Sequence, residues 1–140
     1  MLKNIPAILP PDLLKTLAEM GHGDELVLAD GNFPAAALAQ RLVRADGHGI
    51  PALLEAILQL YPLDTYVDCP VALMDNGDPG RRPPVWEDYS KAILRHEGDR
   101  QVELVERFAF YDRAKKAYAI LATGETALYA NIILKKGVVT

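Results

Sequence analysis

The chain has 140 residues, of which 50% are hydrophobic and 24% are charged, a balance typical of one globular domain. Its net charge of −4 argues against sequence-independent nucleic-acid binding, because such binding needs a basic surface. No apolar run is long enough to cross a membrane, no secretory signal is visible, and the single cysteine can form no intrachain disulfide. We therefore expect a cytoplasmic protein with no nucleic-acid or membrane partner.

The N-terminal part contains a predicted helix over residues 11–20, with apolar side chains at helical spacing. Gly21 follows, where a helix end favours positive φ. The apolar run 26–29 predicts a buried strand, and Asp30 comes directly after it. A glycine-flanked histidine, His22, therefore lies before this strand and a carboxylate lies after it.

The rest of the chain alternates between helical and strand-like patterns, which predicts an α/β fold. We expect helices at 35–40, 50–60, 86–95 and 108–116, strands at 41–45, 65–74, 102–106, 118–123 and 131–135, and a turn-rich loop at 75–84. Pro70 interrupts the second of these strands, which predicts a bend or an edge strand. The apolar run 132–134 lacks alternation and predicts burial on both faces, which we expect a neighbouring subunit to help provide.

His22 is the first candidate for chemistry, because histidine exchanges protons near neutral pH and the flanking glycines let a ligand approach closely. The alternative is a surface loop histidine with no catalytic role, which is the commoner case. The histidines lack metal-ligand spacing, so we predict no metal site. The only serine, Ser90, lies outside any nucleophile motif, which argues against acyl transfer.

Further polar and aromatic residues fall at the ends of predicted elements, where binding sites are usually built. They suit a polyhydroxylated ligand, since carboxylates and amides pair with hydroxyl groups and tyrosine rings pack on a sugar. Arg107 also has a simpler interpretation as a surface arginine at a helix start, and Tyr111 and Tyr129 as half-buried aromatic residues. The set is Asp30, Asp64, Arg107, Tyr111, Tyr129 and Asn131.

Four stretches in the same order resemble the fucose mutarotase and ribose pyranase family over nearly the whole chain. They are MGHGDELVLADGNFP at 20–34, RADG at 44–47, RFAFY at 107–111, and TGE at 123–125 continuing through Tyr129 to KGV at 136–138. The resemblance implies one sugar mutarotase domain over residues 1–140, with a layered, ribose-pyranase-like α/β/α fold and a mixed sheet. It also implies cofactor-independent chemistry and a ring-shaped homo-oligomer, with a decamer favoured and sites between neighbours.

The resemblance also implies residue roles. His22 corresponds to the proton donor, and Asp64 is a second catalytic candidate. The positions that correspond to sugar contacts are Asp30, Met74, Arg107, Tyr111, Tyr129, Ala130 and Asn131. The HGD and RFAFY runs favour the fucose branch, whereas the alanine at 130 is usual in the ribose branch. We expect acid–base interconversion of the α and β anomers of free L-fucose, with D-ribose pyranase activity or a non-catalytic monosaccharide-binding transport accessory as alternatives.

Overall fold

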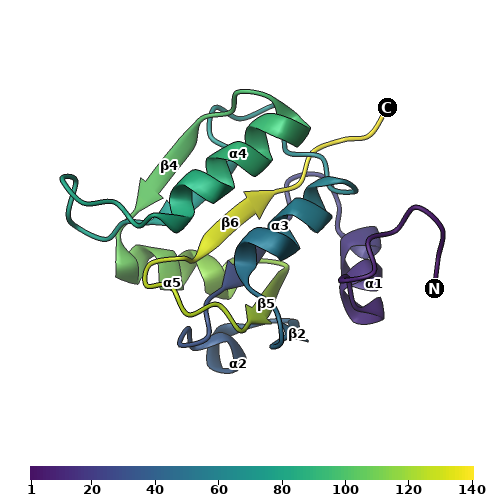
Figure 1. Ribbon diagram of the computed structural model, residues 1–140, viewed down its shortest axis with the longest axis horizontal. Coiled ribbons are helices and arrows are strands. Elements are labelled where there is room, and N and C mark those ends of the chain that lie inside the picture. The colour runs from purple at the N-terminus through teal and green to yellow at the C-terminus, as the bar shows by residue number, and fades with distance from the viewer.

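The computed structural model describes all 140 residues as six strands and five helices (Figure 1). In chain order the elements are α1 (Pro11–Glu19), β1 (Glu25–Ala29), α2 (Ala35–Leu38), β2 (Leu42–Ala45), α3 (Ile50–Leu58), β3 (Val71–Met74), α4 (Val85–Glu97), β4 (Val102–Val105), α5 (Arg107–Lys116), β5 (Ala119–Thr123) and β6 (Ile132–Lys135). No helix is both long and apolar enough to cross a membrane.

The strands form one mixed sheet in the order β2-β5-β1-β6-β3-β4. Neighbouring strands are parallel except at β6, which runs antiparallel to both β1 and β3. The carboxyl ends of the five parallel strands therefore meet at one edge of the sheet, together with the start of β6. We call this the carboxyl edge, and the opposite one the amino edge.

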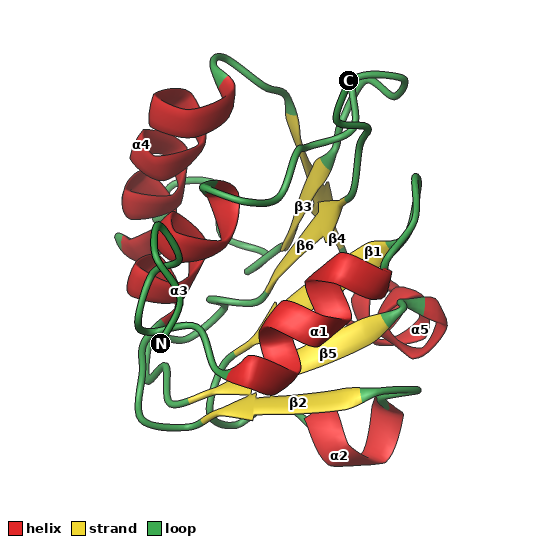
Figure 2. Cartoon of the chain, turned by 90° about the vertical axis from the view of Figure 1, so that its right-hand side faces the viewer, coloured by secondary structure: helices red, strands yellow, loops and turns green.

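Helices cover both faces of the sheet and make an α/β/α sandwich (Figure 2). On one face α1, α3 and α4 enclose the larger core, which contains Leu13, Leu54 and Tyr89. On the other face α2 and α5 enclose a smaller core around Phe110. Because helices cover both faces of the sheet, the inner strands β1, β3, β5 and β6 are mostly continuous apolar runs. The predicted layered fold with a mixed sheet is thus confirmed.

Each predicted helix and strand has a counterpart, but three local predictions need correction. Gly21 does not adopt positive φ, which occurs instead at Gly23 with φ +87°. The stretch 65–70 is not a strand, since β3 begins only at Val71, after the proline. Proline has no N–H to give to a ladder, so the predicted bend is right. The edge-strand alternative is wrong, because β3 pairs on both sides.

The apolar run 132–134 is buried on both faces, as predicted, but not with a neighbour's help. It forms β6, which lies between β1 and β3 near the middle of the sheet (Figure 1). Ile132 and Leu134 belong to the larger core and Ile133 to the smaller one, and all three are fully buried. This run therefore gives no physical reason to expect a second subunit.

Candidate functional site

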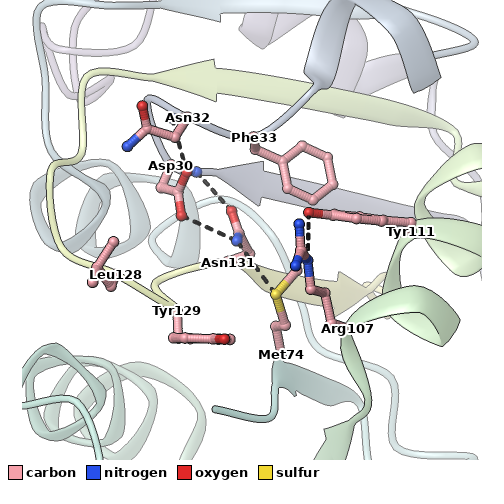
Figure 3. Close-up of a pocket in the computed structure, with 9 residues that line it drawn as sticks. All are labelled: Asp30, Asn32, Phe33, Met74, Arg107, Tyr111, Leu128, Tyr129 and Asn131. Carbon is pink, nitrogen blue, oxygen red and sulfur yellow. Dashed lines mark hydrogen bonds between the residues drawn. The ribbon is translucent and has the colours of Figure 1, made fainter.

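A cavity of about 220 Å³ opens at the carboxyl edge, and we call it the carboxyl-edge pocket. It lies beyond the ends of β1 and β3, between the start of α5 and the segment that leads into β6 (Figure 3). Open α/β sheets commonly bind ligands beyond the carboxyl ends of their strands. The lining residues are Asp30, Asn32, Phe33, Met74, Arg107, Tyr111, Leu128, Tyr129 and Asn131.

Asp30 and Asn131 form the hydrogen-bonded polar part of this pocket. The backbone N–H of Asp30 donates to Asn131 Oδ1 at 2.7 Å, and Asn131 Nδ2 donates back to Asp30 Oδ2 at 3.1 Å. The backbone N–H of Asn32 donates to Asp30 Oδ1 at 2.9 Å. These bonds fix the orientation of both side chains. Because an ionised carboxylate accepts about four hydrogen bonds, Asp30 can still accept from ligand hydroxyl groups.

A second wall of the pocket is cationic and aromatic. Arg107 Nε donates to the Tyr111 hydroxyl at 3.1 Å, and this hydrogen bond raises the pKa of Arg107, which stays charged. The rings of Phe33 and Tyr111 meet edge to face, with centroids 5.4 Å apart. Glu106 caps α5 by accepting from the backbone N–H groups of Phe108 and Ala109, which fixes the helix start that carries Arg107.

The remaining wall comes from Met74, at the end of β3, and from the segment before β6. Asn131 Nδ2 lies 3.9 Å from the Met74 sulfur. Tyr129 has φ +53°, a left-handed conformation that is unusual for a residue with a side chain. Its ring faces the pocket beside Met74 (Figure 3).

His22 and Asp64 lie at the amino edge, away from this pocket. His22 Nε2 and Asp64 Oδ1 are 2.9 Å apart, and the Tyr66 ring packs edge to face on the imidazole. Burial raises the pKa of Asp64, but hydrogen bonds from the Tyr66 backbone and from His22, with the charges of His22 and Lys135, outweigh it and hold that pKa below its ordinary value. Asp64 is therefore an ionised partner that can orient the imidazole, whose side chain is 40% exposed.

The structure separates the predicted site residues into two groups. Asp30, Met74, Arg107, Tyr111, Tyr129 and Asn131 line the carboxyl-edge pocket, whereas His22 and Asp64 pair at the amino edge. Ala130 lines neither, because its methyl group is buried in the larger core and only its carbonyl group is engaged, by Tyr89. No group of three or more His, Cys, Asp or Glu side chains is arranged to hold a metal ion.

Three lining residues were missed in the sequence: Asn32, Phe33 and Leu128. Each lies within three positions of a predicted site residue, in a loop at the same edge of the sheet. The signal that could have found them is the loop itself, because the segments directly after β1 and directly before β6 both lie at the carboxyl edge.

The comparisons of this chain with known proteins all point to the same family. The RbsD / FucU transport protein family matches residues 3–139. The fucose mutarotase of Homo sapiens is 55% identical over 144 residues, covering 98% of this chain and 94% of the relative. The crystal structure of the fucose mutarotase from Streptococcus pneumoniae, in complex with L-fucose, superposes with a TM-score of 0.95 at 55% identity, covering 99% of this chain and all of that one.

A more distant structure, Bacillus subtilis RbsD complexed with D-ribose, superposes with a TM-score of 0.73 at 22% identity and covers both chains fully. At that identity the likeness extends to the fold only. The overall fold is therefore shared by proteins whose sequences have diverged widely.

Proposed function

This chain belongs to the RbsD / FucU family, and from that premise we propose that it is an L-fucose mutarotase, an isomerase that interconverts the α and β anomers of free L-fucose. The relatives named fucose mutarotase and matched over nearly their full length support fucose rather than ribose as the substrate. The reaction opens and recloses the pyranose ring and leaves the composition of the sugar unchanged.

The chemistry requires one acid and one base. The anomeric hydroxyl loses its proton, the bond between the anomeric carbon and the ring oxygen breaks, and the ring oxygen gains a proton. The resulting aldehyde turns over, and the ring hydroxyl attacks its other face while the two protons return. No net proton or electron is exchanged, so we propose a reaction without a cofactor. Positioned acid–base groups typically accelerate such a reaction by roughly 10²- to 10⁴-fold.

The composition of the carboxyl-edge pocket is the observation that carries this proposal. Its volume of about 220 Å³ lies below the range of roughly 300–1,000 Å³ typical for drug-sized ligands and suits a single sugar ring. We propose that Asp30, Arg107 and Asn131 bind sugar hydroxyl groups, because they supply fixed acceptors and donors. Tyr111 and Tyr129 then pack on carbon-bound hydrogens, with Met74 as an apolar wall.

We further propose that His22 is the proton donor and that Asp64 orients it. One chain cannot bring His22 to a sugar in its own pocket, because the two lie at opposite ends of β1. A strand of five residues spans about 17 Å, which is beyond the reach of an imidazole. The exposed His22 side chain can instead enter the pocket of an adjacent copy.

We propose a ring-shaped homo-oligomer, with a decamer favoured by the family resemblance, in which residues 1–140 of each copy form a single sugar mutarotase domain. A heterologous contact, in which one surface of a copy meets a different surface of the next, closes into such a ring. We place the protein in the cytoplasm, where a reducing environment would keep the partly exposed thiol of Cys69 free.

Saturation-transfer NMR on L-fucose tests the function directly. Irradiating the α-anomer resonance should reduce the β-anomer resonance faster with protein present than in buffer alone. In a side-by-side measurement, the protein should accelerate the exchange of D-ribose less than that of L-fucose. A protein that binds L-fucose without accelerating exchange would instead be the monosaccharide-binding transport accessory, and faster exchange with D-ribose would make it a pyranase.

A further inference from the structure

Two side chains of α4 hold the backbone of the segment that leads into β6. Trp86 Nε1 donates to the carbonyl oxygen of Tyr129 at 2.9 Å, and the Tyr89 hydroxyl donates to the carbonyl oxygen of Ala130 at 2.7 Å. Both donors lie in the larger core, with Trp86 9% and Tyr89 1% exposed. Neither lines the carboxyl-edge pocket. They reach the pocket only through the backbone of two consecutive residues.

The segment needs this support. Residues 124–131 contain no regular helix or strand, and Tyr129 holds φ +53° within them. A left-handed conformation at a residue with a side chain is costly and persists only where surrounding contacts impose it. The following residue, Asn131, must also be placed so that its amide meets Asp30. Two buried donors on one rigid helix supply these contacts on the side facing away from the pocket.

The two donors are themselves fixed. Trp86 and Tyr89 are three positions apart on α4 and so lie on the same helix face. The Arg82 guanidinium lies 5.4 Å from the centre of the Trp86 ring and is bound to Asp75 at 2.8 Å. Burial, followed by the negative charges of Glu125, Asp30 and Asp88, raises the pKa of the Tyr89 hydroxyl well above its usual range, so it stays a donor.

We propose that Trp86 and Tyr89 are positioning residues for sugar binding, which set the Tyr129 ring and the Asn131 amide in the carboxyl-edge pocket through the backbone. This inference rests on the proposed function. It predicts an effect on sugar affinity rather than on the chemical step, because the interaction is present before and during ring opening. Loss of one such bond should weaken L-fucose binding by roughly tenfold.

Tyr89→Phe is the main test variant, because it removes the hydroxyl and keeps the ring. Tyr61→Phe is the matched control, since Tyr61 is 2% exposed and its hydroxyl donates to the carbonyl oxygen of Leu134 at 2.9 Å, on the part of β6 away from the pocket. Both variants should lose similar stability. Only Tyr89→Phe should raise the L-fucose concentration for half-maximal exchange, with little change at saturation. Trp86→Phe should act in the same direction.

A measurement on the unmodified protein keeps the test independent of variant folding. Trp86 is the only tryptophan, so the protein has a single indole N–H resonance that reports the bond to Tyr129. L-Fucose at saturation should shift it. Positioning by α4 is overturned if the wild-type protein exchanges anomers but the indole resonance does not move, or if folded Tyr89→Phe keeps the wild-type half-saturation. Wild-type protein without anomer exchange would instead overturn the proposed function.

Discussion

His22 and Asp64 are 42 positions apart in the chain, yet Nε2 of the imidazole lies 2.9 Å from Oδ1 of the carboxylate. Asp64 is held from several sides. Its backbone N–H donates to the carbonyl oxygen of Lys135 at 3.0 Å, and its carbonyl oxygen accepts from Arg100. The neighbouring N–H of Leu63 donates to Glu97 Oε1 at 2.8 Å. A buried, well-fixed carboxylate paired with an exposed imidazole is suited to orienting a proton donor.

Replacing either partner should slow anomer exchange without unfolding the protein. We expect His22→Ala to lower the rate at saturating L-fucose by roughly 100-fold, because a positioned acid is lost. Asp64→Asn should lower it between roughly tenfold and 100-fold, because the imidazole loses its hydrogen bond to a charged orienting partner. NMR exchange, with circular dichroism for folding, measures both. The control is Asp68→Asn, which removes an exposed carboxylate nearby. A folded His22→Ala protein with the wild-type rate would show that another group carries the proton.

The fold could largely be predicted from the sequence because its elements depend on local patterns. The helix over 50–58 has apolar residues at helical spacing and a proline in its first turn, and the strand over 25–29 is a short apolar run. Strand order could not be predicted this way. β6 pairs with β1, more than a hundred positions earlier, and no local pattern specifies that long-range choice.

Several residues that line the carboxyl-edge pocket could be predicted from the sequence, but their arrangement in space could not. The residue types at the ends of predicted elements, with the family resemblance, pointed to Asp30, Arg107 and Asn131, and these meet in one pocket. The sequence already placed His22 before the first strand and Asp30 after it, but it did not reveal that Asp64, 42 positions further along the chain, pairs with His22 at the amino edge. It also did not reveal Trp86, since a helix pattern shows an aromatic core residue but not the carbonyl group that its N–H reaches.

Gly137 should be required beside Asp64 because a side chain does not fit there. A Cβ at this position would lie 2.5 Å from the carbonyl oxygen of Leu63 and 2.9 Å from Asp64 Cα, and both are backbone atoms. We expect Gly137→Ala to destabilise the protein by about 1–3 kcal/mol through overpacking and to slow exchange by displacing Asp64. Gly47→Ala is the control, since its Cβ would meet nothing within 4 Å. Urea denaturation and NMR exchange measure the two effects, and equal behaviour of the two variants would contradict the prediction.

Glu55 links α3 to α4 and should make stability depend on acidic pH. Its carboxylate accepts two hydrogen bonds from Arg95, at 2.9 and 2.8 Å, which together with His96 outweigh burial and lower its pKa from 4.5 to about 2. A lowered pKa in the folded state stabilises the protein above pH 4.5, and this contribution is lost as the pH falls toward 2. Because Glu55 is partly exposed, solvent screening limits this contribution to the free energy of unfolding to about 1 kcal/mol.

The measurement is the stability difference between wild type and Glu55→Gln, by urea denaturation at fixed protein concentration. That difference should be largest at neutral pH and should shrink through the window from pH 4.5 to about 2. Asp112→Asn, which changes an exposed carboxylate on α5, should show no such trend. A Glu55→Gln difference that stays constant through the window would contradict the role of this pair.

Mixing two inactive variants tests whether neighbouring copies share a site. His22→Ala removes the proposed donor and keeps the pocket, whereas Asn131→Ala damages the pocket and keeps the donor. If His22 of one copy serves the pocket of the next, equal mixing after dissociation should restore roughly one quarter of wild-type activity, because one interface in four combines two intact halves. Light scattering must show a multi-subunit mass, and each variant reassembled alone is the control. A monomeric mass, or no recovery in well-mixed oligomers, would show that His22 does not serve the pocket of a neighbouring copy.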